Sequence, residues 1–345
     1  MKILIATSGV PFMRGDAEIL AGNLLEALSE AGHEGELAVI PFKDYPPGRI
    51  PDQILACRLL DLTETCGVRI DRLIGLKFPA YLIPHPSKVI WLLHQHRAAY
   101  ELWDHPAGGL IECPDGSVIR DAIRQADREL ILEAKAVYGL SQSVSGRLRR
   151  YSGIASEPLY HPPANAPLFY KSAAADYFFF PGPVSSVNRQ WLAIQALAQC
   201  RERVRIRFAG EPGSLAQQAK SANKLKFSDR VEWLGMLSED QKRGLYANCL
   251  GVIFPPVDED YGYATLEAML SSKPVITSSD SGGPLEFVLD RQTGLVAHST
   301  PESLAEAMDT LWAERGCAAV MGEAGRAHYR DLHISWANVV EKLLC

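Results

Sequence analysis

The sequence lacks the marks of a disulfide-stabilised, metal-structured or nucleic-acid-binding protein. Its seven cysteines are scattered without a Cys-x-x-Cys pair, which predicts reduced thiols rather than a disulfide framework or a zinc site. The formal net charge of −6 argues against a general nucleic-acid surface, because such a surface concentrates Lys and Arg. No apolar run reaches transmembrane length, and the apolar start at residues 3–6 is too short for a signal peptide. We therefore expect a cytoplasmic protein without a nucleic-acid partner.

A dinucleotide-binding fingerprint is also missing. The segment 9–18, which follows the first predicted strand, does not have the Gly-x-Gly-x-x-Gly spacing. The hypothesis of an enzyme that transfers hydride therefore lacks its usual sequence support. What the chain does have is length and apolar content. With 345 residues, 47% of them hydrophobic, it exceeds one ordinary core and predicts two domains.

In the first half, apolar strands alternate with helical patterns, which predicts a mostly parallel α/β sheet. The predicted strands are 2–6, 36–40, 73–76, 89–93 and 136–140, and the predicted helices are 17–31 and 117–134. The proline-rich segment 160–167 predicts a stiff linker. We accordingly expect domains at 1–163 and 164–330, followed by a terminal segment, 331–345, whose helix packs back toward the first domain.

The most informative segment, Pro255 to Met269, follows a predicted buried strand and opens onto a predicted helix from Tyr263 to Ser271. Gly262 has no side chain, so a ligand can approach its backbone, and the first helical turn presents unpaired N–H groups to a phosphate. Glu267 lies about one turn into the helix, where a carboxylate can accept two vicinal ribose hydroxyls. Glu259 would face the sugar. Solvated loop carboxylates and a helix-dipole preference remain the alternative explanation.

A second glycine turn follows the next predicted strand. Lys273-Pro-Val-Ile leads into this strand, and the segment 281–288, which begins Ser-Gly-Gly-Pro, is predicted to open onto another helix. Two neighbouring strands whose carboxyl ends both open into glycine loops describe the crevice where open α/β sheets bind ligands. A turn at Thr293-Gly294-Leu295 then enters a further strand.

Together these residues resemble the retaining GT-B glycosyltransferases of family 4, the glycosyl transferases group 1. The resemblance rests on the Glu-x7-Glu spacing, Lys-Pro-Val-Ile, Gly-Gly-Pro-x-Glu and Thr-Gly-Leu, all in the carboxyl-terminal half. It implies an α/β, GT-B fold of two Rossmann-like domains with parallel sheets that face each other across a cleft. It also implies metal-independent transfer of a sugar, with retention, from a nucleotide-diphosphate sugar to a sugar or lipid-linked glycan acceptor, in cell-surface glycan or polysaccharide biosynthesis. The donor is a substrate, and no cofactor is implied.

The resemblance also assigns site residues. His94 matches a histidine that faces the donor sugar, and Glu259 would orient the sugar hydroxyls. The residues expected to bind the nucleotide are Gly15, Gly182, Arg189, Leu234, Gly262, Tyr263, Ala264 and Glu267. Three positions depart from the family pattern: Asp16 replaces a glycine, Pro183 an arginine and Asn188 a lysine. Arg189 is the nearest remaining cation, predicted either to neutralise the leaving diphosphate or to be a solvated helix-start residue.

Several alternatives stay open. His94 and His96 share a period-two face, but no third metal ligand is evident, so no metal is expected. Arg97, Tyr100 and Trp103 would fall on successive turns of a helix. The basic cluster at 147–150 fits either a solvated helix end or weak peripheral membrane association. A sugar-nucleotide epimerase of the same plan and a catalytically silent nucleotide-binding protein are the rival functions.

Overall fold

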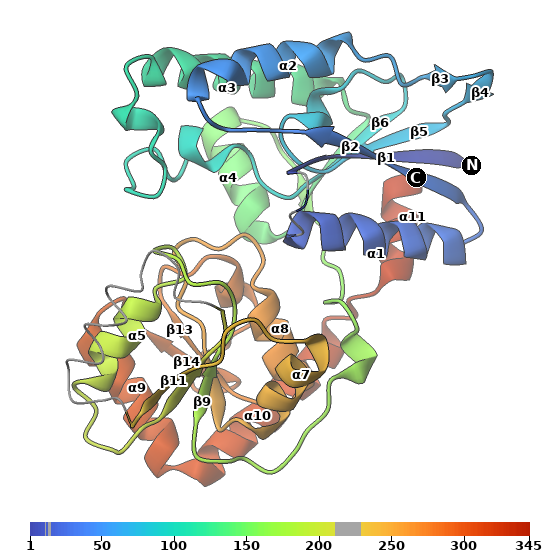
Figure 1. The fold of residues 1–345 in the computed structure, drawn as a ribbon. Helices are drawn as coiled ribbons and strands as arrows, with labels where there is room; N and C mark the ends of the chain where they lie inside the picture. Colours follow the sequence, from blue (N-terminus) through green and yellow to red (C-terminus); the bar gives the residue numbers. More distant parts are fainter. Residues whose placement is uncertain (11, 13–14, 211–228) are drawn as a thin grey trace. The chain divides into compact units, whose positions relative to one another are not determined.

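The computed structural model describes residues 1–345 except 11, 13–14 and 211–228. The side chain of Asp16 is likewise outside the described part. The chain divides into two compact units (Figure 1). Unit 1 comprises Met1–Ala164 and Ser335–Cys345, and unit 2 comprises Asn165–Ile334. The division falls inside the proline-rich segment 160–167, and residues 331–334 lie in unit 2 although the sequence analysis placed them in the terminal segment.

Unit 1 is built on a six-stranded sheet in which every pair is parallel. In spatial order its strands are β2 (Glu34–Pro41), β1 (Lys2–Gly9), β5 (Arg72–Gly75), β6 (Lys88–Leu92), β7 (Ala136–Gly139) and β8 (Glu157–Pro158). The five predicted strands are confirmed. The apolar runs of β1, β5 and β6 are buried central strands, as in parallel sheets covered on both faces, whereas β2 is a largely exposed edge strand.

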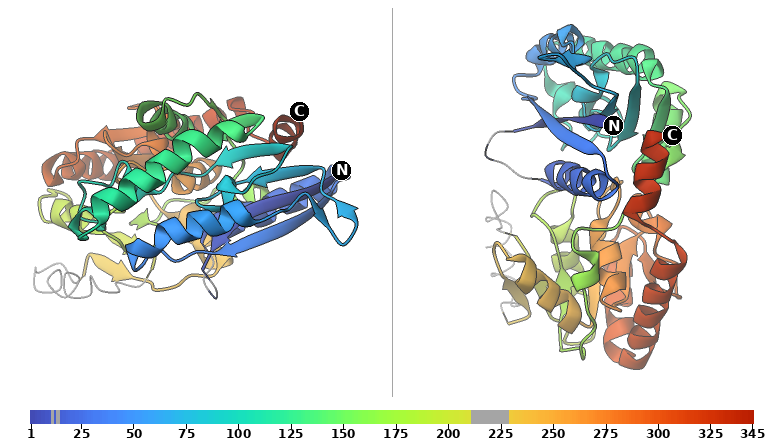
Figure 2. Two further views of the ribbon diagram at one scale, coloured as in Figure 1. Left: turned by 90° about the horizontal axis from the view of Figure 1, so that it is seen from above. Right: turned by 90° about the vertical axis from the view of Figure 1, so that its right-hand side faces the viewer.

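Helices cover both faces of this sheet, as Figure 2 shows from two sides. The helices of unit 1 are α1 (Asp16–Glu30), α2 (Ile50–Leu59), α3 (Gly116–Leu130), α4 (Gln142–Ser152) and α11 (Trp336–Leu344). Helices α2 and α3 pack together, and α1 contacts α11. The buried guanidinium of Arg72 donates to the carbonyl oxygen of Leu343 at 2.7 Å, which ties α11 to β5.

Short elements complete unit 1. They are the hairpin of β3 (Glu64–Thr65) and β4 (Val68–Arg69) and the 3₁₀ turns Pro47–Arg49, Ala80–Leu82, Arg97–Ala99, Leu110–Glu112 and Ile131–Glu133. The turn at Arg97–Ala99 corrects the prediction that Arg97, Tyr100 and Trp103 lie on successive helical turns. Tyr100 takes a non-helical conformation, and its buried hydroxyl donates a hydrogen bond to Asp127.

Unit 2 repeats the plan with a second parallel sheet. Its strands, in spatial order, are β11 (Val231–Trp233), β10 (Ile206–Phe208), β9 (Phe178–Phe180), β12 (Gly251–Ile253), β13 (Val275–Ser278) and β14 (Gly294–Ala297). The two sheets confirm the predicted α/β, GT-B class of two Rossmann-like domains.

The central strand β9 shows how this core is divided. Phe178 and Phe180 point to one face and pack with α5 (Gln190–Leu197) and α9 (Pro301–Ala313), while Phe179 points to the other. The remaining elements of unit 2 are α7 (Glu239–Asn248), α8 (Tyr263–Leu270), α10 (Arg315–Asp331) and the 3₁₀ turns Ala166–Leu168 and Gly283–Glu286. Helices α7 and α8 share the core cluster of Phe179. The predicted helix after the Gly282-Gly283 turn is wrong: only the 3₁₀ turn forms there.

Within the described ranges, no helix is both long and apolar enough to cross a lipid bilayer.

Candidate active site

The candidate site lies at the carboxyl edge of the unit 2 sheet, where the strand order reverses. From β9 the chain moves outward to β10 and β11, whereas β12, on the other side of β9, leads to β13 and β14. Open α/β sheets bind ligands at such a reversal, outside the carboxyl ends of the strands. The loops after β9 and β12, together with helix α8, carry six of the eight residues predicted to hold the nucleotide, and the loop after β13 lies beside them.

Backbone hydrogen bonds join these three loops. The N–H of Val257 donates to the carbonyl of Val187 at 2.8 Å, and that of Asp258 donates to the carbonyl of Asp280 at 3.0 Å. The N–H of Glu259 donates to Ser281 at 2.9 Å, and its carbonyl accepts from Gly283 at 2.8 Å. Both backbone polar groups of Glu259 are therefore hydrogen-bonded, which fixes the position from which its half-buried side chain extends.

Gly262 begins α8 in the left-handed conformation, with φ of 87°. A Cβ at this position would lie 2.8 Å from Cγ of Pro284. The sequence analysis explained this glycine by the approach of a ligand, but the structure supplies another reason, because a left-handed turn and a neighbouring proline both require it. Tyr263 is half-buried beside the ring of Tyr261, at 5.1 Å between centroids, and Ala264 is buried.

Glu267 points from the second turn of α8 and is nearly buried. Its Oε1 accepts a hydrogen bond from Nζ of Lys242 on α7 at 2.9 Å. Burial raises the pKa of Glu267 above its ordinary value, although the charge and hydrogen bond of Lys242 and the hydroxyl of Tyr246 act in the opposite direction. A buried carboxylate with one charged partner can accept further hydrogen bonds from hydroxyl groups, because its two oxygens offer about four acceptor positions.

Arg189 is held by an acidic partner. Its guanidinium donates two hydrogen bonds of 2.7 Å to the carboxylate of Asp280 in the loop after β13. Burial acts to raise the pKa of Asp280, but Arg189 and a hydrogen bond from Ser299 bring it below its ordinary value. Any anion that approaches Arg189 therefore competes with a bidentate carboxylate.

The loop after β9 is braced by the two residues that depart from the family pattern. Gly182 has φ of 96°, and the following Pro183 offers its carbonyl to Nδ2 of Asn188 at 2.7 Å and to Nε2 of Gln190 at 3.0 Å. Pro183 and Asn188 thus build the turn where arginine and lysine were expected. Leu234 follows β11, and its N–H donates to Phe208 at 2.9 Å within the sheet.

In unit 1, Gly15 and His94 follow strands of the same sheet. The N–H of Gly15, at the start of α1, donates to the Glu18 carboxylate at 2.9 Å, so an anion already occupies this helix end. His94 is half-buried, and its Nδ1 lies 2.6 Å from the carbonyl oxygen of Gln95. Burial, with the nearby charge of His94, lowers the pKa of His96 to about 4, and its ring packs on Phe78.

Within the described part of the chain, no group of three or more His, Cys, Asp or Glu side chains could hold a metal ion.

Comparison with known proteins places these features in a family. Residues 171–328 match the family model described as glycosyl transferases group 1. These residues belong to that family. The segment contains both glycine loops, Glu259, Glu267, Arg189 and Leu234, while Gly15 and His94 lie outside it.

Individual relatives agree with this assignment. Over 156 residues the chain is 31% identical to the human alpha-1,3/1,6-mannosyltransferase ALG2, which covers 41% of this chain and 37% of that protein. The matches span between 24% and 37% of the length of the ALG2 mannosyltransferases of human, Dictyostelium discoideum and mouse. Sucrose-phosphate synthase from Thermosynechococcus elongatus superposes with a TM-score of 0.80 at 16% identity, covering 99% of this chain and 97% of its own. Anabaena HepE in complex with UDP-glucose superposes with a TM-score of 0.71 at 18% identity, covering 100% and 98%.

Two charged residues of the glycosyl transferases group 1 segment were missed by the sequence analysis. Asp280 lies 91 residues from its partner Arg189, and Lys242 lies 25 residues from Glu267. Neither residue belongs to a motif with recognisable spacing, and only the packing of α7 against α8 and of the two loops brings each pair together.

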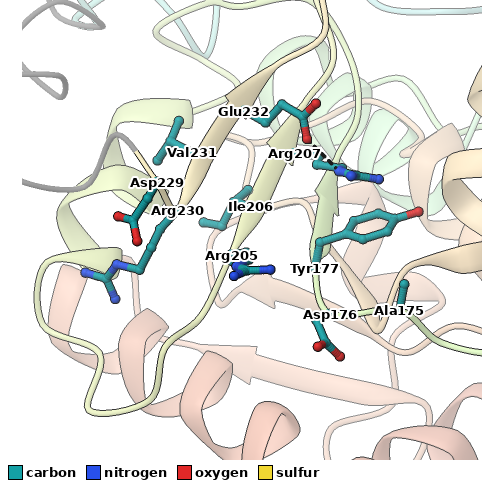
Figure 3. A pocket seen from close by; sticks show the side chains of 10 residues that line it. All are labelled: Ala175, Asp176, Tyr177, Arg205, Ile206, Arg207, Asp229, Arg230, Val231 and Glu232. Carbon is teal, nitrogen blue, oxygen red and sulfur yellow. Dashed lines mark hydrogen bonds and ion pairs between the residues drawn. The ribbon is translucent and has the colours of Figure 1, made fainter.

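A hollow of about 640 Å³ lies at the opposite, amino-terminal ends of β9, β10 and β11 (Figure 3). It is rich in charge, but Nε of Arg207 donates to Glu232 at 2.7 Å, and its guanidinium lies 4.2 Å from the ring centre of Tyr177. Asp176 and Asp229 pair with Arg315 and Arg203. Its position at the amino-terminal edge of the sheet distinguishes this hollow from the candidate site.

The loop that carries His94 is anchored by a buried carboxylate. Asp127 on α3 is fully buried and accepts hydrogen bonds from the hydroxyls of Tyr81 and Tyr100, each at 2.8 Å, and from Nε2 of Gln95 at 2.9 Å. Gln95 is the residue next to His94, so this network anchors the loop to α3.

Asp127 is expected to make stability depend on pH. Burial raises the pKa of Asp127 to about 6, against the effect of its hydrogen bonds, whereas in an unfolded chain it is about 3.9. The folded state therefore binds the proton more tightly, and this contribution to stability is present below pH 4 and lost as the pH rises through 6. Relative to Asp127→Asn, which does not titrate, the wild type should lose about 2 kcal/mol between pH 4.5 and 7.5. Denaturant unfolding of both proteins tests this, and a constant difference would contradict it.

Proposed function

We propose that the protein is a retaining glycosyltransferase that moves a hexose from a nucleotide-diphosphate sugar to a hydroxyl group of a sugar or lipid-linked glycan. The observation that carries this proposal is the placement of Glu259 and Glu267 beside glycine loops at the strand-order reversal of a glycosyl transferases group 1 segment. Relatives support the choice of donor, since Anabaena HepE is described in complex with UDP-glucose and ALG2 is named a mannosyltransferase.

In the proposed complex, the N-terminal turn of α8 and the loop after β9 bind the diphosphate, and Glu267 accepts hydrogen bonds from the ribose. Gly262, Tyr263 and Ala264 supply the helix end. Leu234 lies beside the base. Gly182 lets the backbone approach the phosphates. No metal ion takes part in this proposal.

Chemistry then needs no protein nucleophile. The bond between the anomeric carbon and the phosphate oxygen breaks, and the acceptor oxygen bonds to the same face of that carbon. The acceptor proton passes to the departing phosphate oxygen. Glu259 orients the sugar hydroxyls, and His94 donates to a sugar hydroxyl or stabilises charge at the reacting carbon.

NMR spectroscopy tests this function. A panel of nucleotide sugars is first screened for thermal stabilisation, because a ligand that binds the native state raises Tm. The best donor is then followed with and without a panel of sugar acceptors. A glycosidic product whose anomeric configuration equals that of the donor is expected. Conversion of the donor to an epimer without acceptor would indicate an epimerase, and binding without turnover would indicate a silent nucleotide-binding protein.

The second of these rivals is favoured by one observation: Arg189 is paired with Asp280, while Pro183 and Asn188 stand where the resemblance implies an arginine and a lysine. If Arg189 nevertheless stabilises the leaving diphosphate, Arg189→Ala should lower kcat by more than about tenfold, since charge-assisted hydrogen bonds are worth about 1.5 to 3 kcal/mol. Asp280→Asn should raise the affinity for the nucleoside diphosphate, because it releases the guanidinium of Arg189 from its carboxylate partner. Steady-state kinetics and calorimetry measure both, and an unchanged kcat in Arg189→Ala rules out the clamp.

We further propose a role in cell-surface glycan or polysaccharide biosynthesis at the cytoplasmic side of the membrane, with weak peripheral association through the basic end of α4. Co-sedimentation with vesicles containing anionic lipid tests that association, and its loss at high salt is expected.

A further inference from the structure

A lysine lies beside the carboxylate that is proposed to bind ribose. Lys242 occupies the first half of α7, and its Nζ lies 2.9 Å from Oε1 of Glu267 and 3.1 Å from Oε2 of Glu239. Its side chain is 26% exposed, whereas that of Glu267 is 10% exposed. The lysine therefore reaches from the rim of the site to a carboxylate that solvent scarcely contacts.

This contact solves a physical problem of the site. A nearly buried carboxylate loses hydration and tends to bind a proton, and a protonated carboxyl group is a poorer acceptor for two hydroxyl groups. A neighbouring ammonium group favours the ionised form. The contact also restrains the carboxylate, because Oε1 has a fixed partner while acceptor capacity remains for a ligand.

Other charged groups near Glu267 do not replace Lys242. Glu239, also on α7, raises the pKa of Glu267, and the nearby hydroxyl of Tyr246, which lowers it, carries no charge. Helix α10 packs against α8 as well, but its Arg315 and Glu323 pair with Asp176 and Lys171.

We propose that Lys242 is a positioning residue of the nucleotide site, which keeps Glu267 ionised and oriented toward the 2′- and 3′-hydroxyls of a ribonucleotide. The inference rests on the proposed function, because it takes Glu267 as the ribose-binding group. It adds a specificity that the site would not otherwise have: a preference for ribonucleotides that persists at mildly acidic pH.

Calorimetric titration tests this without knowledge of the sugar or the acceptor. UDP, GDP and ADP are titrated separately, and the tightest of the three is compared with its 2′-deoxy analogue at pH 8 and pH 6. The wild type should prefer the ribonucleotide by about tenfold or more at both pH values, as expected for a charge-assisted hydrogen bond. In Glu267→Gln the preference should fall to about threefold or less.

The lysine variants separate its role from simple packing. Lys242→Met keeps most of the length of the side chain but removes the charge, so the pKa of Glu267 rises further and the preference should fall below that of the wild type, more at pH 6 than at pH 8. Lys242→Arg keeps the charge and should behave like the wild type. Affinity for the deoxynucleotide should stay within about threefold in all three variants, which a general loss of structure would not allow. Lys242→Gln gives the same comparison if the methionine variant does not fold.

The outcomes distinguish this inference from the function on which it depends. A wild-type preference in Lys242→Met at both pH values, together with a lost preference in Glu267→Gln, overturns the role of Lys242 alone. A preference that survives in Glu267→Gln, or no binding of any of the three nucleotides to the wild type, overturns both.

Discussion

Replacing Glu259 by glutamine is expected to lower kcat by about 10- to 100-fold while leaving the affinity for the nucleoside diphosphate within about threefold of the wild type. The reason is that Glu259 is proposed to contact only the sugar, and each charge-assisted hydrogen bond is worth about 1.5 to 3 kcal/mol. The backbone of Glu259 is held by Ser281 and Gly283, so the substitution changes the carboxylate and not the loop.

Two measurements on the same variant check this prediction. Steady-state turnover of the best nucleotide sugar gives kcat, and calorimetry with the nucleoside diphosphate gives Kd. Glu232→Gln is the matched control, because it removes the same charge from an exposed position on β11 and should leave both values unchanged. A loss of nucleotide affinity as large as the loss of kcat would show that Glu259 binds the nucleotide rather than the sugar.

Gly282→Ala is expected to have the largest effect on the fold of the site. Gly282 has φ of 69° and ψ of −122°, which L residues rarely adopt. A Cβ there would lie 2.6 Å from the carbonyl oxygen and 2.8 Å from the nitrogen of Glu259. Both are backbone atoms of the joined loops, so no flexible side chain can move to make room. We expect a loss of about 3 kcal/mol or more in the stability of unit 2, together with loss of nucleotide binding.

Thermal unfolding with and without nucleoside diphosphate measures this effect. Gly316→Ala is the control in the same unit, because Gly316 lies in α10 and its added Cβ would have no neighbour within 4 Å. That variant should be neutral or more stable by up to about 1 kcal/mol, as expected for glycine replaced by alanine in a helix. Equal melting of the two variants would show that the close contact at Gly282 is unimportant.

The buried strands of unit 1 could be predicted because each is a short apolar run, as at Arg72–Gly75 and Lys88–Leu92. Glycine turns after two such strands also indicated the ligand-binding edge. The length of the elements after those turns was less predictable. Gly282-Gly283 leads only into a 3₁₀ turn, and its backbone packs closely against the backbone of residues 258–261. That contact between two loops is not visible in the local sequence.

The charges of the site could not be predicted from local pattern. Arg189 was expected to face a diphosphate, but its binding to Asp280 depends on two loops that are distant in sequence. Glu267 was expected to be a carboxylate open to ribose, but its burial and its contact with Lys242 depend on the packing of α7 and α8. Spacing within a segment identifies which residues share a loop or a helix turn, and it says nothing of which opposite charges a tertiary fold brings to 3 Å.

A crystal structure of the protein with a nucleoside diphosphate tests the central claim most directly. We predict that the diphosphate lies at the N-terminal end of α8 and that the ribose hydroxyls lie about 3 Å from the carboxylate of Glu267. A nucleotide bound instead in the hollow lined by Arg205 and Arg207, or anywhere away from the carboxyl edge of the unit 2 sheet, would contradict the account.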